Sequence, residues 1–247
     1  MSDTAPVFLV PALPAGSTFV LDGPEGRHAA GVRRLGPGEA LVVADGCGGG
    51  AACVVDSVVG KDSLALTVSR RWQDPAPAPR IVLAQALAKG DRGELAVELA
   101  TETGVDAVVP WRASRSVARW DDGPRGAKAL ARWRSTVREA AKQSRRTWVP
   151  PVSEPVSTAG LASLVRSSAL AVVLDAAAPS GLTALPLPAD GDVLLVVGPE
   201  GGISESESET LREAGAQVAR LGPTVLRTST AAAAAIAALG VLTTRWR

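Results

Sequence analysis

From residue 81 onward, short aliphatic segments alternate with segments rich in helix-forming residues. The aliphatic segments are IVLAQAL, VDAVVP, ALAVVLD, DVLLVVG and AQVARL, at residues 81–87, 105–110, 169–175, 192–198 and 216–221. Helices are predicted between and after them, over residues 91–103, 124–146, 161–166, 203–214 and 229–245. Strands this apolar are typical of a mostly parallel sheet that helices cover on both faces. The alternation therefore predicts an α/β domain.

The first 72 residues follow a different pattern, with short strand candidates, glycine-rich or polar turns and one helix candidate over residues 25–35. Short, closely spaced strands are typical of a small β-barrel. Between the two patterns, QDPAPAPR has three prolines in five residues, which neither a helix interior nor a central strand accepts. The sequence therefore predicts two domains, residues 1–72 and 81–247, joined by a linker over residues 73–80.

The stretch VVGPEGGISESE ends a buried strand on a glycine-rich loop and then begins a helix. Three glycines are expected to permit positive φ angles and a close approach of the backbone to a ligand: Gly198, Gly201 and Gly202. Ser204 is a predicted N-cap, and Glu207 is its predicted capping-box partner. Because ligands bind at the carboxyl ends of strands in open α/β sheets, the loop is predicted to form part of a binding site.

Two related turns help to define that site. The same Gly-Pro-Glu-Gly tetrapeptide occurs at residues 23–26, where it is predicted to be a plain turn in a domain of short strands. At residues 220–239, a strand again ends in Gly-Pro before an alanine-rich helix, whose small side chains leave room for another segment or a ligand. No phosphate-loop motif is present, and Glu200 would repel a polyphosphate but tolerate an amine or a sulfonium cation.

Positive charge is concentrated in residues 112–146, although the net charge of the chain is only +1. A helix would place Arg134, Arg138, Lys142 and Arg145 on one face, and would place a buried stripe on another. A second basic cluster includes Arg33 and Arg34. Two such clusters favour contact with a phosphate backbone, and a merely solvated face is the alternative.

Other classes of site lack the residue types they need. Two cysteines and a single histidine, His28, are too few for a disulfide framework or a zinc site. His28 has no Gly-x-Ser-x-Gly turn near it, which disfavours a Ser-His-Asp hydrolase. The N-terminal residues lack the positive charge of a signal peptide, and the longest apolar run, residues 231–242, is too short to span a bilayer. We therefore expect a soluble cytoplasmic protein without a metal or a membrane partner.

In their order along the chain, the loops GPEGGIS and LGPTVLRTSTA resemble those of the SPOUT methyltransferases. Within that class they resemble the RsmE family, the 16S ribosomal RNA (uracil-N3)-methyltransferases. The segments AKGDRGELAVELATETGVDAVVP, REAAKQSRRTWVP and HAAGVRRLGPGEALVVADG are similar to further elements of the family, so the resemblance covers nearly the whole chain. Two positions depart from the family pattern: Ser229 stands where Glu is common, and Thr103 stands where Leu is usual.

The resemblance implies a PUA-like RNA-binding barrel over residues 1–72 and a SPOUT domain with a deep trefoil knot over residues 81–247, in a homodimer. It also implies S-adenosylmethionine in the knot, with contacts at Leu174, Gly198, Gly202, Leu221, Gly222, Leu226 and Arg227. The implied substrate is one uridine near the 3′ end of the small-subunit rRNA. RNA contacts are predicted at Arg33, Arg34, Arg112, Arg115, Arg134 and Arg138.

Methylation of uracil N3 requires loss of a weakly acidic imino proton from a base that is unpaired or flipped out. Arg227 is expected to stabilise the negative charge that develops on the uracil oxygens. Glu200 is the candidate proton acceptor, although it could equally cap the backbone or pair with an arginine.

Two other functions stay open. The chain could methylate a different RNA, such as a tRNA or the large-subunit rRNA, or it could be a non-catalytic RNA-binding protein of ribosome assembly. The intact loop glycines disfavour the second alternative, because glycines cost stability when they serve no purpose.

Overall fold

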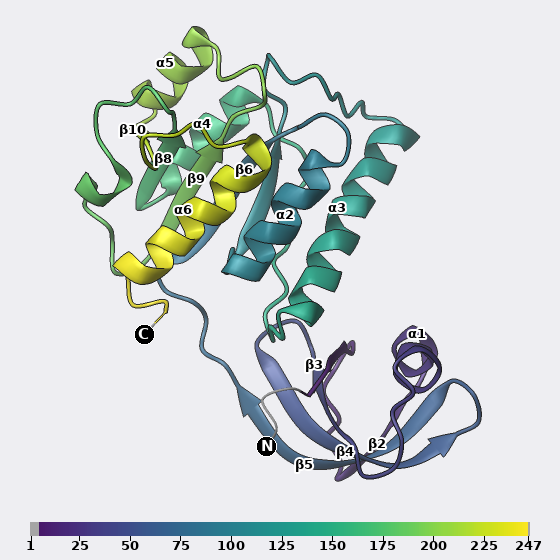
Figure 1. Cartoon of the computed structure of the whole chain (residues 1–247). Helices are drawn as coiled ribbons and strands as arrows, with labels where there is room; N and C mark the ends of the chain where they lie inside the picture. Colours follow the sequence, from purple (N-terminus) through teal and green to yellow (C-terminus); the bar gives the residue numbers. More distant parts are fainter. Residues whose placement is uncertain (1–4, 247) are drawn as a thin grey trace. The chain divides into compact units, whose positions relative to one another are not determined.

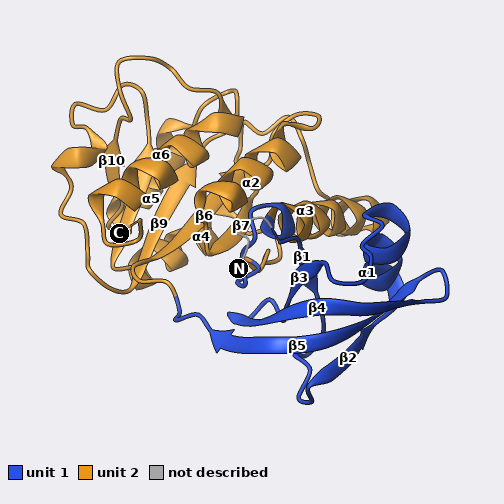
Figure 2. Ribbon diagram, turned by 60° about the horizontal axis from the view of Figure 1, so that its bottom comes forward, with its two compact units in different colours: residues 1–76, 141–149 blue, residues 77–140, 150–247 orange. Residues whose placement is uncertain are grey.

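The computed structural model describes residues 5–246, which form two compact units. The first unit combines the described residues up to Ala76 with Ala141–Val149, and the second combines Pro77–Ala140 with the residues from Pro150 onward (Figure 2). Each unit has its own five-stranded sheet, so the chain has a mixed α/β fold. The sequence pattern did not predict that a segment from the middle of the chain would belong to the first unit.

The sheet of the first unit has the strand order β1-β3-β4-β5-β2. Strand β1 runs parallel to β3, and the other neighbours are antiparallel. Among the described residues, no pairing joins the edge strands β1 and β2, so backbone hydrogen bonds do not close this sheet into a barrel. The strands are Val7–Leu9 (β1), Thr18–Leu21 (β2), Ala40–Ala44 (β3), Gly49–Val59 (β4) and Ser63–Gln73 (β5).

The N-terminal Gly-Pro-Glu-Gly is not the plain turn that the sequence predicted. It begins helix α1 (Gly23–Arg27), which continues as the π-helical segment η1 (His28–Val32). Proline suits the first turn of a helix because its missing N–H needs no partner there. A Cβ atom at Gly26 would lie 2.5 Å from the carbonyl oxygens of both Leu21 and Asp62, so glycine is needed where the helix meets backbone.

Lys142 corrects the predicted basic row. It lies in the last turn of α3 (Pro124–Gln143), is only 7% exposed, and forms an ion pair with Glu25 of the same unit at 3.1 Å. Arg145 lies beyond the end of the helix and has a φ of +58°. The prediction that these basic residues form a single exposed row on one helix is therefore wrong, because Glu25, which is distant in sequence, neutralises Lys142 in the interior.

The buried stripe of α3 is confirmed. Leu130, Trp133, Val137 and Ala141 are each 4% exposed or less. Such a stripe at helical spacing packs against the protein while the polar residues between its members remain at the surface. No helix within residues 5–246 combines the length and the apolar character that a membrane crossing requires.

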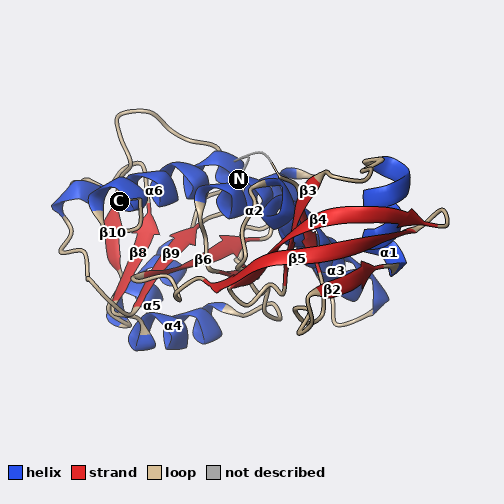
Figure 3. Ribbon diagram, turned by 90° about the horizontal axis from the view of Figure 1, so that it is seen from below, coloured by secondary structure: helices blue, strands red, loops and turns tan. Residues whose placement is uncertain are grey.

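The second unit contains an all-parallel sheet in the order β10-β8-β9-β6-β7 (Figure 1). Helices α2 (Arg92–Thr103) and α6 (Thr228–Leu242) cover one face, and α4 (Thr158–Ser167) and α5 (Glu205–Glu213) cover the other (Figure 3). All five predicted strands form, at Arg80–Ala86 (β6), Ala107–Trp111 (β7), Leu170–Leu174 (β8), Asp192–Val197 (β9) and Gln217–Ala219 (β10).

The strand order brings loops that are distant in sequence to one edge of this sheet. After β7, the chain crosses to the other side of β6 to form β8, and β9 then fills the space between β8 and β6. Because the strands are parallel, their carboxyl ends lie at the same edge. The loops after β8, β9 and β10 therefore meet there, as ligand-binding loops do in open α/β sheets.

Replacing Gly26 by Ala tests the close packing of α1. The added Cβ would meet two carbonyl oxygens at 2.5 Å, so we expect the free energy of unfolding to fall by about 1–3 kcal/mol in urea denaturation. Gly31→Ala is the matched control, because a Cβ there would meet only the Lys61 carbonyl oxygen, 4.0 Å away. Equal stabilities of the two variants would contradict this account.

Candidate functional site

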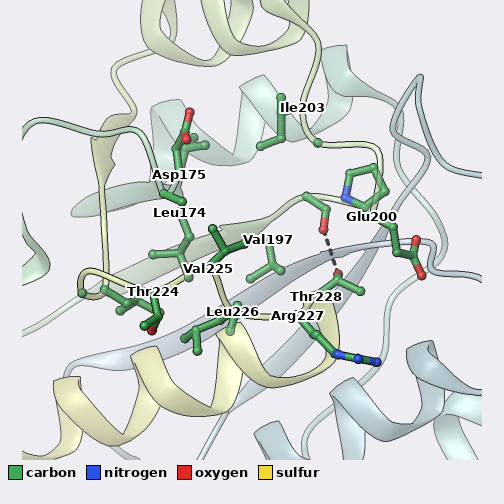
Figure 4. Close-up of a pocket in the computed structure, with 18 of the residues that line it drawn as sticks. Leu174, Asp175, Val197, Glu200, Ile203, Thr224, Val225, Leu226, Arg227 and Thr228 are labelled. Carbon is green, nitrogen blue, oxygen red and sulfur yellow. Dashed lines mark hydrogen bonds between the residues drawn. The ribbon is translucent and has the colours of Figure 1, made fainter.

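A cavity of about 600 Å³ opens where the loops after β8, β9 and β10 meet. Its wall includes Leu174 at the end of β8, Gly198 after β9, Leu221 after β10 and Thr228 at the start of α6 (Figure 4). This volume lies within the range of about 300–1,000 Å³ that is usual for small-molecule sites. The cavity wall combines apolar side chains, such as Leu174 and Val197, with charged ones, such as Asp175 and Glu200, which suits a ligand of mixed polarity.

The glycines of the GPEGGIS loop serve different geometric purposes. Only Gly202 has a positive φ, of +72°, so the expectation of positive φ at Gly198 and Gly201 is wrong. A Cβ at Gly198 would lie 2.7 Å from the Ile203 Cγ1 atom, and one at Gly201 would lie 3.2 Å from the Cβ atom of Arg115. These two glycines allow close packing of the loop, and Gly202 allows its turn.

The predicted capping box of α5 is present. The Ser204 side chain accepts a hydrogen bond from the Glu207 N–H, and the Glu207 carboxylate accepts one from the Ser204 N–H at 3.2 Å. This arrangement satisfies backbone donors that have no partner within the helix. It fixes the point at which the loop after β9 becomes a helix.

Glu207 is also the centre of a wider network. Its carboxylate accepts hydrogen bonds from the N–H and the hydroxyl of Ser114, at 2.8 and 2.7 Å, and from the Thr158 hydroxyl at 3.0 Å. Burial alone would raise the pKa of Glu207, but the hydrogen bonds from Ser114 and Ser204 outweigh it and lower this pKa to about 2. One ionised carboxylate thus joins the loop after β7, the start of α4 and the loop after β9.

A second polar chain joins β6, β9 and α6. The fully buried Gln85 amide donates to the Thr228 hydroxyl at 3.0 Å. That hydroxyl donates to the Gly198 carbonyl at 2.8 Å (Figure 4). Neither side chain was predicted from the sequence as part of the site. The polar Gln85 inside the aliphatic segment IVLAQAL was the available signal, because a buried amide needs hydrogen-bond partners.

Glu200 and Arg227 have different surroundings. Glu200 accepts a hydrogen bond from the Lys89 N–H at 3.2 Å and pairs with Arg92 at 3.3 Å. These are the backbone and arginine contacts that the sequence left open as alternatives to a proton acceptor. Arg227 is the exposed N-cap residue of α6, and among the described residues no ion pair engages its side chain. Figure 4 shows both side chains at the opposite end of the cavity from Asp175.

The positions singled out as cofactor contacts all line this cavity, namely Leu174, Gly198, Gly202, Leu221, Gly222, Leu226 and Arg227. Asp175 also lines it and was missed, although an acid directly after a predicted strand was a visible signal. Ser229, one of the two departures from the family pattern, is only 3% exposed. The binding roles of these residues remain predictions.

The six arginines predicted to contact RNA are exposed. Arg112 pairs with Asp122 at 2.8 Å, and Arg134 pairs with Glu154 at 3.0 Å. Arg115 donates to the Gly201 carbonyl at 3.3 Å, which brings it to the glycine loop of the cavity. Exposed ion pairs of this kind are weak and can be exchanged for phosphate contacts. Arg138 belongs to the second unit, and Arg33 and Arg34 belong to the first.

This chain is similar to known proteins in both sequence and fold. A family model described as an RNA methyltransferase domain matches residues 75–240. The chain is 50% identical to the ribosomal RNA small subunit methyltransferase E of Mycobacterium tuberculosis, over 98% of this chain and 94% of that protein. It is 33% identical to the protein of the same name from Bacillus subtilis, over 92% and 91% of the two chains.

A solved structure extends the similarity to the fold. The crystal structure of a ribosomal RNA small subunit methyltransferase E from Neisseria gonorrhoeae, bound to S-adenosyl methionine, matches with a TM-score of 0.83 at 29% identity. The match covers 97% of this chain and 98% of that one.

Replacing Glu207 by Gln tests the network around its carboxylate. We expect the free energy of unfolding at pH 7 to fall by about 2 kcal/mol, because hydrogen bonds to a charged acceptor are lost. The pKa of Glu207 is about 2 in the folded protein against an ordinary value of 4.5, so its contribution is complete above pH 4.5 and disappears as the pH falls towards 2. Urea denaturation over this pH range would measure the difference.

The control is Glu205→Gln, which neutralises an exposed acid in the same first turn of α5. We expect little change in stability from it. A loss equal to that of Glu207→Gln, or a loss that does not depend on pH, would refute the assignment.

Proposed function

This chain belongs to the ribosomal RNA small subunit methyltransferase E family, and from that premise we propose that it methylates N3 of one uridine near the 3′ end of 16S rRNA. The methyl donor is S-adenosylmethionine, and the substrate RNA is that of the small ribosomal subunit. The observation that carries the proposal is the cavity at the carboxyl ends of β8, β9 and β10, because its lining contains every position that the family resemblance associates with the cofactor.

The proposal extends to the architecture. Residues 1–72 act as a PUA-like domain that helps to hold RNA, and residues 73–80 are the linker. Residues 81–247 form the SPOUT domain, which carries the trefoil knot around which two chains form a homodimer. The similarity to the Neisseria gonorrhoeae structure over 97% of this chain supports a shared architecture. The cytoplasm is the proposed location, because ribosomal subunits are found there.

The residues around the cavity fit S-adenosylmethionine chemically. Leu174, Val197 and Leu226 offer apolar surface to an adenine ring, and the Asp175 carboxylate can accept hydrogen bonds from ribose hydroxyls. A Cβ at Gly222 would meet no protein atom within 4 Å, so the missing side chain leaves space in the wall for a ligand. When bound, S-adenosylmethionine supplies an electrophilic methyl group on a sulfonium sulfur.

Arg227 is the residue best suited to act on the uracil. Its guanidinium lies at the margin of the cavity without an acidic partner among the described residues. It donates to the uracil oxygens and stabilises the negative charge that develops when the N3 proton leaves. The same interaction lowers the pKa of N3, because a nearby positive charge favours the ionised base.

Glu200 is better suited to positioning than to accepting that proton. Its carboxylate is already bonded to the Lys89 N–H and paired with Arg92. Accepting a proton would weaken both interactions, since each is strongest with an ionised acceptor. We therefore assign Glu200 to holding the loop after β9 against the start of α2, and the N3 proton passes to water.

The first experiment would incubate the protein with small ribosomal subunits that lack this modification and with radiolabelled S-adenosylmethionine. Label in 3-methyluridine at one site near the 3′ end of 16S rRNA is the expected result. Label at another nucleotide or in another RNA would show that the substrate differs from the proposed uridine. Cofactor binding without label on any RNA tested would favour a non-catalytic RNA-binding protein.

Arg227→Ala tests the proposed role in charge stabilisation. We expect the rate of methyl transfer to fall by about 100-fold or more, which is the usual effect of removing a donor aimed at developing charge. The cofactor Kd, measured by calorimetry, should change by much less. Equal losses in turnover and cofactor affinity would make Arg227 a cofactor-binding residue instead. Arg166→Ala removes an exposed arginine of α4 and serves as the charge-matched control.

A further inference from the structure

A second cavity, of about 330 Å³, lies within the second unit and is here called the tryptophan–arginine cavity. Two tryptophans, three arginines and one acid contribute to its wall: Trp120, Trp133, Arg119, Arg125, Arg132 and Glu94. We propose that it binds one nucleotide of the RNA strand next to the target uridine. The base of that nucleotide lies against Trp120 and its phosphate lies on Arg119 and Arg125. This inference rests on the proposed function and adds a subsite to it.

One short loop connects the two cavities. Ala88 and Gly90 line the tryptophan–arginine cavity. Arg92 lines the cavity at the carboxyl ends of β8, β9 and β10, here called the cofactor cavity. Between them, the Lys89 N–H donates to Glu200, which also lines the cofactor cavity. The same loop therefore contributes to both walls. An RNA strand that delivers the target uridine to the cofactor cavity therefore has a neighbouring nucleotide close to the tryptophan–arginine cavity.

The aromatic side chains are arranged to present a ring. Trp133 on α3 is only 1% exposed, whereas Trp120 in the loop before α3 is partly exposed. Their ring centroids are 4.9 Å apart with an interplanar angle of 78°, which is a favourable edge-to-face contact. The buried ring thus holds the exposed one in place. Stacking on such a ring suits any base, because every base has a π-face.

The charges of this cavity favour an anion. Arg132 pairs with Glu94 at 3.4 Å, which accounts for one arginine and the acid. Arg119 and Arg125 are exposed, and neither forms an ion pair among the described residues. Two uncompensated guanidinium groups beside an aromatic ring match the phosphate and the base of a nucleotide. An apolar or cationic ligand would leave these charges without a partner.

The test measures methyl transfer to small ribosomal subunits that lack the modification. For Trp120→Ala, and separately for the double change of Arg119→Ala with Arg125→Ala, we expect KM for the subunits to rise about tenfold, in line with the stacking contribution of one base. The kcat and the cofactor Kd should stay within about twofold of the wild-type values. Trp120→Phe keeps an aromatic face and should restore most of the affinity. Arg166→Ala is the control for loss of positive charge.

A second measurement links the side chain to a base. Fluorescence anisotropy would report binding of a single-stranded RNA oligonucleotide around the target uridine, with an abasic ribose on either side in turn. In the wild-type protein, one abasic position should weaken binding about as much as Trp120→Ala does. In the Trp120→Ala variant, that same position should have no further effect. If the abasic position weakened binding equally in the wild type and in the Trp120→Ala variant, Trp120 would not contact this base.

The outcomes separate this inference from the proposed function. If the wild-type protein transfers no methyl group to small subunits, the proposed function fails and the subsite fails with it. If the wild type is active but the Trp120 and arginine variants have the KM of Arg166→Ala, only the subsite is overturned. An unchanged cofactor Kd shows that each variant has kept its fold.

Discussion

The hydrogen bonds to the ionised carboxylate of Glu207 hold the loop after β9, which forms part of the cofactor cavity. Parallel strands place their carboxyl ends at one edge of a sheet, but they do not determine how the following loops pack. From helix α5, Glu207 joins the loop after β7, the start of α4 and the loop after β9 by accepting hydrogen bonds from Ser114, Thr158 and Ser204. Because several donors surround it, the buried charge is stabilised rather than costly. The loop after β9 is thereby held in one conformation.

Small residues let the backbone come close at the points where the loops meet. Gly198 packs against Ile203, and its carbonyl accepts a hydrogen bond from the Thr228 hydroxyl, which joins the loop after β9 to α6. Gly201 approaches Arg115 in the same way. These close contacts fix the backbone of the loop after β9, which forms part of the cavity wall.

Arginines line both cavities of the second unit, and they differ in whether an acidic side chain pairs with them. Arg92 and Arg132 are paired with Glu200 and Glu94, whereas Arg227 has no acidic partner among the described residues. Paired arginines contribute to the walls, and unpaired ones remain available for a polyanionic ligand. Some arginines of the second unit therefore have a structural role, and others face a ligand.

Local sequence determined the parallel strands, the helices of the second unit and the capping box of Ser204 and Glu207. Such features depend on residues within one or two turns of each other. Tertiary structure alone decided that Glu200 pairs with Arg92, 108 residues away, and that Lys142 is buried against Glu25, 117 residues away. It also decided that Gly-Pro-Glu-Gly begins a helix near the N-terminus but a loop after β9. The physical reason is that ion pairs, burial and cavities depend on which distant segments meet.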